Sequence, residues 1–224
     1  MKISIITLFP ELFPPVLNSS ILGRAQKKGL VEFELINLRD FGQGTHKTVD
    51  DRPYGGGAGM VLKPDVLSAA VKKARRKGTW VILTSASGKP FNQTKARELI
   101  KFKHIIIVCG HYEGLDQRFI DKYVSEEISI GDYVLTGGEL PAMVIADALT
   151  RLIPNVLEKE EATRNESFEQ GLLEYPQYTR PEQFEGEKVP EVLLSGNHRQ
   201  ILNWRREKSL EKTRRFRPDL LERV

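Results

Sequence analysis

Four short runs rich in Ile, Val and other apolar residues constrain the fold of this chain more than any other feature. The runs are Ile3–Phe9, Val31–Leu38, Trp80–Thr84 and His104–Cys109. Helical-looking segments, among them Pro64–Arg76 and Gln93–Lys101, separate them. Within the last run, Ile105–Val108 offers no polar face, as expected for a central strand covered by helices on both sides. The alternation predicts an α/β fold in which a parallel sheet lies between two helical layers.

A longer apolar helix is predicted between Thr136 and Pro154. Thr136 and Glu139 have the spacing of a capping box, and Leu135 with Leu140 has the spacing of the accompanying hydrophobic staple. Pro141 favours a slightly later start, because proline is tolerated best in the first helical turn.

The chain changes character after this helix. Its next residues are rich in Glu and poor in apolar side chains, as in a linker. Glycines and prolines then interrupt short segments that lead into helical stretches. We expect a sheet domain at 1–159, a flexible linker at 160–169 and a small, mostly helical, basic domain at 170–224.

Charge and composition exclude several classes of protein. Of the 224 residues 40% are hydrophobic, yet no apolar run approaches a membrane span, and the first run continues into Pro10 and Glu11 rather than a signal-peptide core. A soluble, cytoplasmic protein without a membrane partner is expected. A single cysteine, Cys109, excludes an internal disulfide and a multi-cysteine metal centre, and its place in an apolar strand predicts a core residue.

The basic excess lies at the C-terminal end. The segment Arg199–Val224 has nine Lys or Arg against four Asp or Glu, whereas the whole chain has a net charge of +4. A basic segment with Trp and Phe is typical of proteins that bind a phosphate backbone. A solvated helix whose cations pair with its own Glu residues is the competing interpretation.

Three glycine-bearing segments follow or flank the predicted strands: Tyr54–Gly59, Gly110–Gly114 and Ile130–Gly138. Ligands of open α/β sheets bind outside the carboxyl ends of the strands, where glycine lets the backbone approach them. A ligand pocket is therefore predicted, although each segment alone is also compatible with a tight turn. None matches the dinucleotide fingerprint or the P-loop, so NAD- and ATP-dependent chemistry is disfavoured.

Other polar residues carry weaker signals. The four histidines lack the helical spacing of a zinc site, so no metal ligands are predicted. Asp50 and Asp51 beside Arg52 form either a substrate contact or an acidic turn. From the residues alone, a ligand-dependent enzyme, a nucleotide-sensing module and an RNA-binding module remain open.

Several long strings together carry a family resemblance. They are Val49–Met60 (VDDRPYGGGAGM), Val108–Asp116 (VCGHYEGLD), Ser129–Met143 (SIGDYVLTGGELPAM), Tyr178–Pro181 (YTRP) and Val192–His198 (VLLSGNH). In this order, from Leu8 to the C-terminal end, the chain resembles the TrmD family, the bacterial tRNA (guanine-N1)-methyltransferases.

The resemblance implies the SPOUT fold, whose sheet domain ends in a C-terminal trefoil knot that holds S-adenosylmethionine. Chains generally avoid knots, so nothing in the periodicity predicts this one. It further implies a homodimer with the active site at the subunit interface. The implied reaction methylates N1 of the guanosine at tRNA position 37, next to the anticodon.

The resemblance also assigns the binding residues of S-adenosylmethionine. They are Gly110, Tyr112, Glu113, Ser129, Ile130, Gly131, Asp132, Tyr133, Val134, Leu135, Gly137, Gly138 and Pro141. One loop departs from the family, which often has proline where this chain has Thr84–Gly88. Mg²⁺ is compatible with such a site but has no signature in these residues.

Methyl transfer to guanine N1 requires removal of the N1 proton and stabilisation of the charge that develops toward O6. By resemblance, Glu166 in the linker, where the family has aspartate, is the base, Arg151 stabilises O6, and Glu113 helps hold the guanine. The implied tRNA contacts are Arg151, Asp50, Tyr54, Gly55, Gly196, Asn197, Arg205 and Arg206. A ribose 2′-O-methyltransferase on the same fold and a non-catalytic RNA-binding module are the alternatives.

Overall fold

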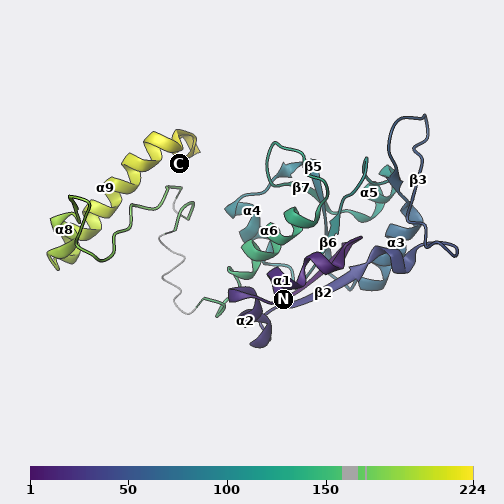
Figure 1. The fold of residues 1–224 in the computed structure, drawn as a ribbon, viewed down its shortest axis with the longest axis horizontal. Coiled ribbons are helices and arrows are strands. Elements are labelled where there is room, and N and C mark those ends of the chain that lie inside the picture. The colour runs from purple at the N-terminus through teal and green to yellow at the C-terminus, as the bar shows by residue number, and fades with distance from the viewer. Residues whose placement is uncertain (158–165, 170, 224) are drawn as a thin grey trace. The chain divides into compact units, whose positions relative to one another are not determined.

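The computed structural model describes residues 1–157, 166–169 and 171–223 (Figure 1). The chain forms two compact units, Met1–Glu158 and Lys159–Val224, and each is described by itself. Most of the predicted linker 160–169 lies outside the described residues, and the two predicted boundaries, 159/160 and 169/170, stay a prediction.

A five-stranded sheet with the order β2-β1-β6-β5-β7 forms the centre of the first unit. Its strands are β1 (Lys2–Thr7), β2 (Glu32–Asn37), β5 (Trp80–Pro90), β6 (His104–Cys109) and β7 (Glu126–Ser129). Every neighbouring pair is parallel, and Ile105 pairs with Ile3 on one side and Trp80 on the other. The predicted parallel sheet is confirmed. Strand β7 escapes prediction because two of its four residues are glutamates.

Helices cover both faces of this sheet (Figure 1). One face packs against α1 (Pro14–Leu17), α2 (Ser20–Lys27), α4 (Gln93–Leu99) and α6 (Glu139–Thr150). The other packs against α3 (Pro64–Ala74), α5 (Gln117–Tyr123) and the 3₁₀ turn η2 (Leu38–Phe41). Ile105 and Ile107 contribute to the first core and Ile106 and Val108 to the second, all fully buried, so the predicted two-sided burial of this strand is confirmed.

The start of α6 corrects one prediction. Its N-cap is Gly138, which has no side chain, and the helix begins at Glu139 rather than near Thr136. The capping box is therefore wrong, because the Glu139 carboxylate bonds to Thr7 on β1. Leu140 remains 59% exposed, so the expected staple buries little surface. Pro141 lies in the first turn, as expected.

Two small elements complete the first unit. Strands β3 (Asp50–Asp51) and β4 (Val61–Leu62) pair antiparallel, and Leu62 also bridges to Leu115 after β6. The short helix η1 (Pro10–Leu12) follows β1. No helix in the described part of the chain has the length and hydropathy that crossing a membrane requires.

The second unit is built on the long helix α9 (His198–Phe216). Before it lie the hairpin β8 (Gln183–Phe184) and β9 (Glu187–Lys188) and the short helix α8 (Glu191–Leu194), and η3 (Pro218–Arg223) follows it. Ser209 and Thr213, both buried on α9, hydrogen-bond to the backbone of Leu173. These bonds hold the extended segment after Gly171 along the helix.

Candidate active site

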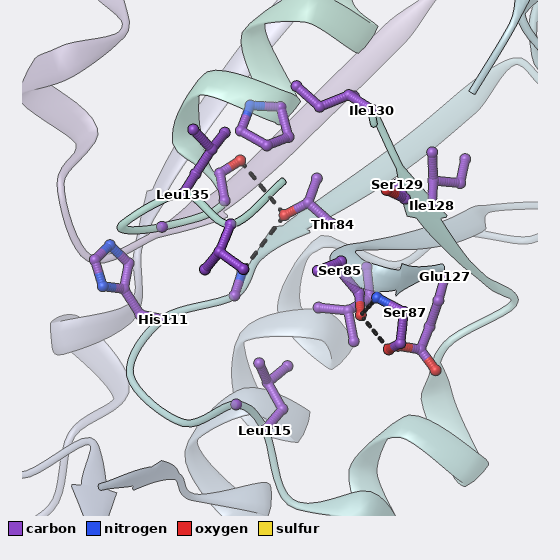
Figure 2. A pocket seen from close by; sticks show the side chains of 18 of the residues that line it. Thr84, Ser85, Ser87, His111, Leu115, Glu127, Ile128, Ser129, Ile130 and Leu135 are labelled. Atoms are coloured by element: carbon purple, nitrogen blue, oxygen red, sulfur yellow. Dashed lines mark hydrogen bonds between the residues drawn. The ribbon is translucent and has the colours of Figure 1, made fainter. Parts of the chain in front are cut away.

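A cavity of about 530 Å³ opens at the carboxyl ends of β6 and β7, beside the middle of β5 (Figure 2). Three segments form its walls: the stretch 84–87 of β5, where the pairing with β7 is interrupted by a register shift, the loop that follows β6, and the loop between β7 and α6. The second and third are glycine segments that the sequence placed at strand ends, and the structure brings them together. This is the position at which open α/β sheets bind ligands.

Close backbone contact joins the three segments beneath the cavity. Gly138 N donates to Gly110 O at 2.8 Å, and Gly110 N donates to Thr84 Oγ1 at 3.4 Å. Figure 2 shows the Thr84 hydroxyl with its hydrogen bonds. A Cβ added to Gly138 would lie 2.1 Å from Thr84 Oγ1 and 2.6 Å from Gly110 N. Only glycine allows this approach, so the residue is needed for close packing rather than for a positive φ.

A buried polar group supports the loop after β6. Glu139 is 4% exposed, and its carboxylate accepts a hydrogen bond from Thr7 Oγ1 at 2.7 Å and lies 3.1 Å from His111 Nε2. His111 in turn lies against the ring of Phe9 at 5.1 Å between centroids. A buried carboxylate is tolerated only when its oxygens are bonded in this way, so Glu139 fixes His111 at the cavity wall.

The first glycine segment, Tyr54–Gly59, does not line the cavity but contacts its rim. Glu113 N donates to Met60 O at 3.0 Å, and the Glu113 carboxylate lies so close to Gly59 that a Cβ there would be 2.3 Å from its Oε1. Tyr112, next to it, has φ +58°, a strained conformation that persists only where its surroundings impose it. The glycine segment thus positions Glu113.

The electrostatic character of the cavity follows from its lining. Its acidic side chains are Glu113 and Glu127, and His111 is its only other titratable side chain apart from tyrosines; no Lys or Arg belongs to the described lining. Such a cavity suits a ligand with positive charge better than a phosphorylated one. Below the site, burial and the nearby Glu139 charge raise the pKa of the Cys109 thiol well above its usual value, which makes this thiol a poor nucleophile.

The predicted methyl-donor contacts lie together, since all of them except Asp132 line the cavity. Sequence reasoning assigned no ligand contact to several lining residues, among them His111, Leu115 and Glu127. The segment Thr84–Gly88, which departs from the family, was predicted as a loop after a strand but lies within β5, and its residues 84–87 line the cavity. The prediction is wrong because β5 continues past Thr84 to Pro90, with its pairing to β7 shifted in register between Thr84 and Lys89.

The predicted tRNA contacts of the first unit lie elsewhere. Asp50 lies in β3, Tyr54 is 98% exposed, and Gly55 faces open space. Arg151 is the C-cap of α6. Because a helix rises 1.5 Å per residue, it lies about 20 Å along the helix from Gly138 and the cavity.

The remaining predicted residues belong to the second unit. Gly196 precedes Asn197, whose side chain caps α9 by accepting from Gln200 N at 3.2 Å. The Arg205 guanidinium lies 4.8 Å from the Tyr175 ring, and Arg206 is exposed. Glu166 is half-buried within a short turn, where its carbonyl accepts from Glu169 N.

Comparisons with known proteins agree on one family. Residues 1–223 match the family model described as tRNA (guanine-1)-methyltransferase TrmD. The chain is 56% identical to the tRNA (guanine-N(1)-)-methyltransferase of Dictyoglomus turgidum, over 100% of this chain and 91% of the relative. It is 56% identical to that of Halalkalibacterium halodurans, over 99% and 92%, and 55% identical to that of an Exiguobacterium species, over 100% and 94%.

Proposed function

The chain belongs to the TrmD family of tRNA (guanine-N1)-methyltransferases, and on that premise we propose that it transfers a methyl group from S-adenosylmethionine to N1 of guanosine 37 in tRNA. The observation that carries the proposal is the cavity between β5 and two glycine-rich loops, which has two carboxylates and, in its described lining, no cationic side chain. The proposed place of action is the cytoplasm, where tRNA is matured.

The residues of this cavity fit the methyl donor. S-adenosylmethionine carries a sulfonium, an ammonium and an adenine, and when bound it supplies an electrophilic methyl group. Glu113 and Glu127 provide negative charge for its cationic groups, and exposed backbone groups of Gly110–Gly114 and Ser129–Gly138 are suited to hydrogen-bond the adenine and the amino acid. A nucleotide cofactor would bring phosphates to the same carboxylates, with no cation in the described lining to receive them.

The acceptor needs a base and a cation. Guanine N1 bears a proton in an amide-like group, so Glu166 is proposed to take this proton while Arg151 stabilises the negative charge at O6. Glu113, held by Met60 and Gly59 at the cavity rim, is proposed to hold the guanine in place. A glutamate has nearly the basicity of the aspartate usual in the family.

The distance along α6 supports a homodimer with shared active sites. Arg151 lies at the far end of the helix from the cavity of its own chain, so a second copy is needed to bring an Arg151 to the acceptor. Helices α1 and α6, which cover one sheet face, and the short helix η1 before α1 also keep apolar side chains exposed, namely Leu12, Val16, Leu140 and Val144. Exposed apolar side chains that gather on one face are typical of an interface.

Two finer features are proposed on the family resemblance. One is the trefoil knot, supported by the bond from Gly138 to Gly110, which ties the entry of α6 to the loop after β6. The other is tRNA binding by the domain at 170–224, supported by the cations of α9. Arg206, Lys212 and Arg214 are exposed there, whereas Lys208 and Arg217 pair with Glu211 and Asp219.

Labelled methyl transfer to two tRNA transcripts that differ only at the nucleotide after the anticodon tests the function. We expect transfer to the transcript with guanosine at that position alone, and mass spectrometry of the nucleoside should locate the methyl group on the base. A sugar-methylated product would support the 2′-O-methyltransferase instead. Failure of S-adenosylmethionine to raise the melting temperature would support a non-catalytic RNA-binding module.

Glu166→Ala tests the base in single-turnover methylation, with Glu166→Asp as the conservative control. Activity of Glu166→Ala within a few-fold of wild type would exclude the assignment.

Subunit complementation tests the shared site: Arg151→Ala and Gly138→Ala chains are each expected to be inactive. Random mixing of the two should restore about a quarter of the wild-type activity, because half of the dimers then contain one intact site. No recovery from mixed dimers would refute the sharing of sites.

A further inference from the structure

A second cavity, of about 410 Å³, lies within the second unit, and the proposed reaction leaves it without a role. It forms where the extended segment Tyr175–Arg180 passes along the first half of α9, closed on the remaining side by α8 and the residues before it. Its volume is in the range of sites that bind small ligands or parts of larger ones.

Three aromatic side chains dominate its walls: Tyr175, Tyr178 and Trp204. Tyr178 and Trp204 lie 6.2 Å apart with their planes tilted by 59°, and Tyr178 is 49% exposed. Val189, Leu193, Leu194 and Ile201 add aliphatic side chains to the lining. Aromatic rings left open at a cavity mouth offer faces on which a flat ring can stack.

The polar groups of the same cavity are of both signs. Arg180 and Arg205 supply guanidinium groups, and Glu182 supplies a carboxylate. Arg205 stacks on the Tyr175 ring, yet its buried Nε has no hydrogen-bond acceptor in the described part of the chain. The guanidinium also carries N–H donors at its terminal nitrogens, so a ligand that brings acceptors is favoured at this wall.

These features favour a nucleobase over a phosphate. A phosphate would meet the Glu182 carboxylate and gain nothing from the aromatic rings, whereas a base presents a flat face together with both acceptors and donors at its edge. The helix that carries Trp204 and Arg205 also carries the exposed cations Arg206, Lys212 and Arg214, which are suited to the adjacent backbone.

We propose that this cavity binds one unpaired base of the tRNA, distinct from the guanine that is methylated. The base stacks against Trp204 and Tyr178 and is hydrogen-bonded by Arg205. This binding rests on tRNA being the substrate, and it would anchor the RNA by a nucleotide remote from the reacting atoms.

Tryptophan fluorescence gives a direct readout, because the chain has two tryptophans and Trp80→Phe leaves Trp204 as the only one. Titration with tRNA should quench Trp204 saturably. A set of transcripts with one unpaired nucleotide at a time made abasic should contain one, away from the methylated guanosine, that no longer quenches.

The same set of transcripts supports a double-mutant cycle. Trp204→Leu should raise the Kd of intact tRNA about tenfold to a hundredfold, the range expected for one stacked base. It should leave the Kd of the one critical abasic transcript nearly unchanged, because the two changes remove the same contact. Trp204→Phe keeps a stacking face and should stay within a few-fold of wild type, as should Leu202→Ala, which alters an exposed side chain of α9 outside the cavity.

The outcomes separate this proposal from the proposed function. The base site alone is refuted if tRNA is methylated but does not quench Trp204. It is also refuted if tRNA is methylated and the effect of Trp204→Leu on the free energy of tRNA binding adds to that of every abasic change. Quenching that maps to one nucleotide, without methyl transfer, refutes the reaction and leaves the base site in place. A shift of Trp204→Leu to a smaller oligomer, with tRNA affinity intact, would identify a second copy as the occupant and overturn the proposal.

Discussion

Replacing Gly138 by alanine should displace the loop that forms one wall of the cavity and so disrupt the binding site. The new Cβ would lie 2.1 Å from Thr84 Oγ1, 2.6 Å from Gly110 N and 2.8 Å from the Cα of Cys109. Two of these three atoms belong to the backbone of β6 and the loop after it, which cannot rotate away. The loop containing Gly138 must therefore move, and its hydrogen bond to Gly110 lengthens or breaks.

General values bound the loss in free energy of unfolding that Gly138→Ala should cause. Overpacking of a closely packed site destabilises by about 1–3 kcal/mol, which for a domain of this size lowers the melting temperature by about 2–4 °C per kcal/mol. S-adenosylmethionine at about 100 times its Kd stabilises wild type by about 2.7 kcal/mol. Without ligand, Gly138→Ala should melt at a lower temperature than wild type. S-adenosylmethionine should then raise its melting temperature far less than it raises that of wild type.

Thermal unfolding with and without S-adenosylmethionine measures both effects. Gly29→Ala is the matched control, because a Cβ there meets nothing within 4 Å while φ is +69°, so it should cost about 1 kcal/mol without altering the cavity. Adding Thr84→Ala to Gly138→Ala removes only the contact with Oγ1 and should recover little. A full ligand-induced shift in Gly138→Ala would refute the inference that these loops hold the methyl donor.

Three further predictions concern acid stability, thiol reactivity and salt. Burial and the charges of Lys2 and Arg76 lower the pKa of His104 below 6.5, so the unfolded chain binds the proton more tightly, and the free energy of unfolding should fall as the pH drops below about 6.5. In urea titrations between about pH 7 and about pH 5, the free energy of unfolding of His104→Gln should therefore fall less than that of wild type. An equal fall in both proteins would contradict this. Cys109, whose pKa burial raises, should react with a thiol reagent only as fast as the protein opens; rapid stoichiometric labelling of native protein would count against this. The tRNA Kd should rise steeply with salt, and Arg214→Ala should reduce the slope of log Kd against log salt by about one, whereas Arg217→Ala, already paired with Asp219, should change it less.

His104 illustrates what a sequence leaves undecided about a polar residue. Its Nε2 lies 2.9 Å from Ser4 Oγ, which donates to Glu34, and its Nδ1 lies 2.8 Å from Thr79 Oγ1. Ser4 Oγ is therefore an acceptor toward Nε2–H. Because burial lowers the pKa of His104, the neutral ring is favoured, and Nδ1 then accepts from Thr79. The partners are 25 to 100 positions away along the chain, so no local pattern contained this assignment.

The hydrogen-bond partner of Glu139, in the candidate active site, also comes from a distant segment of the chain. Its position three residues after Thr136 predicted a capping box, a local interaction. In the structure its carboxylate binds Thr7, which is 132 positions distant, and leaves the helix capped by Gly138. A carboxylate bonds to whichever donor the fold brings within reach, and at this place β1 supplies that donor.

By itself the sequence determined the parallel sheet, because Ile105–Val108 is apolar on both faces and only a strand between two helical layers buries both. It also determined that glycine-rich turns follow the strands, and through its long motifs it determined the family. Tertiary structure alone decided that residues 84–87 join the cavity wall, that Gly59 supports Glu113, and that Arg151 lies a helix length away from its own chain's cavity. The physical reason is that hydropathy reports which faces are buried, whereas close approach and hydrogen bonding depend on atoms from distant segments whose spacing only the packed fold defines.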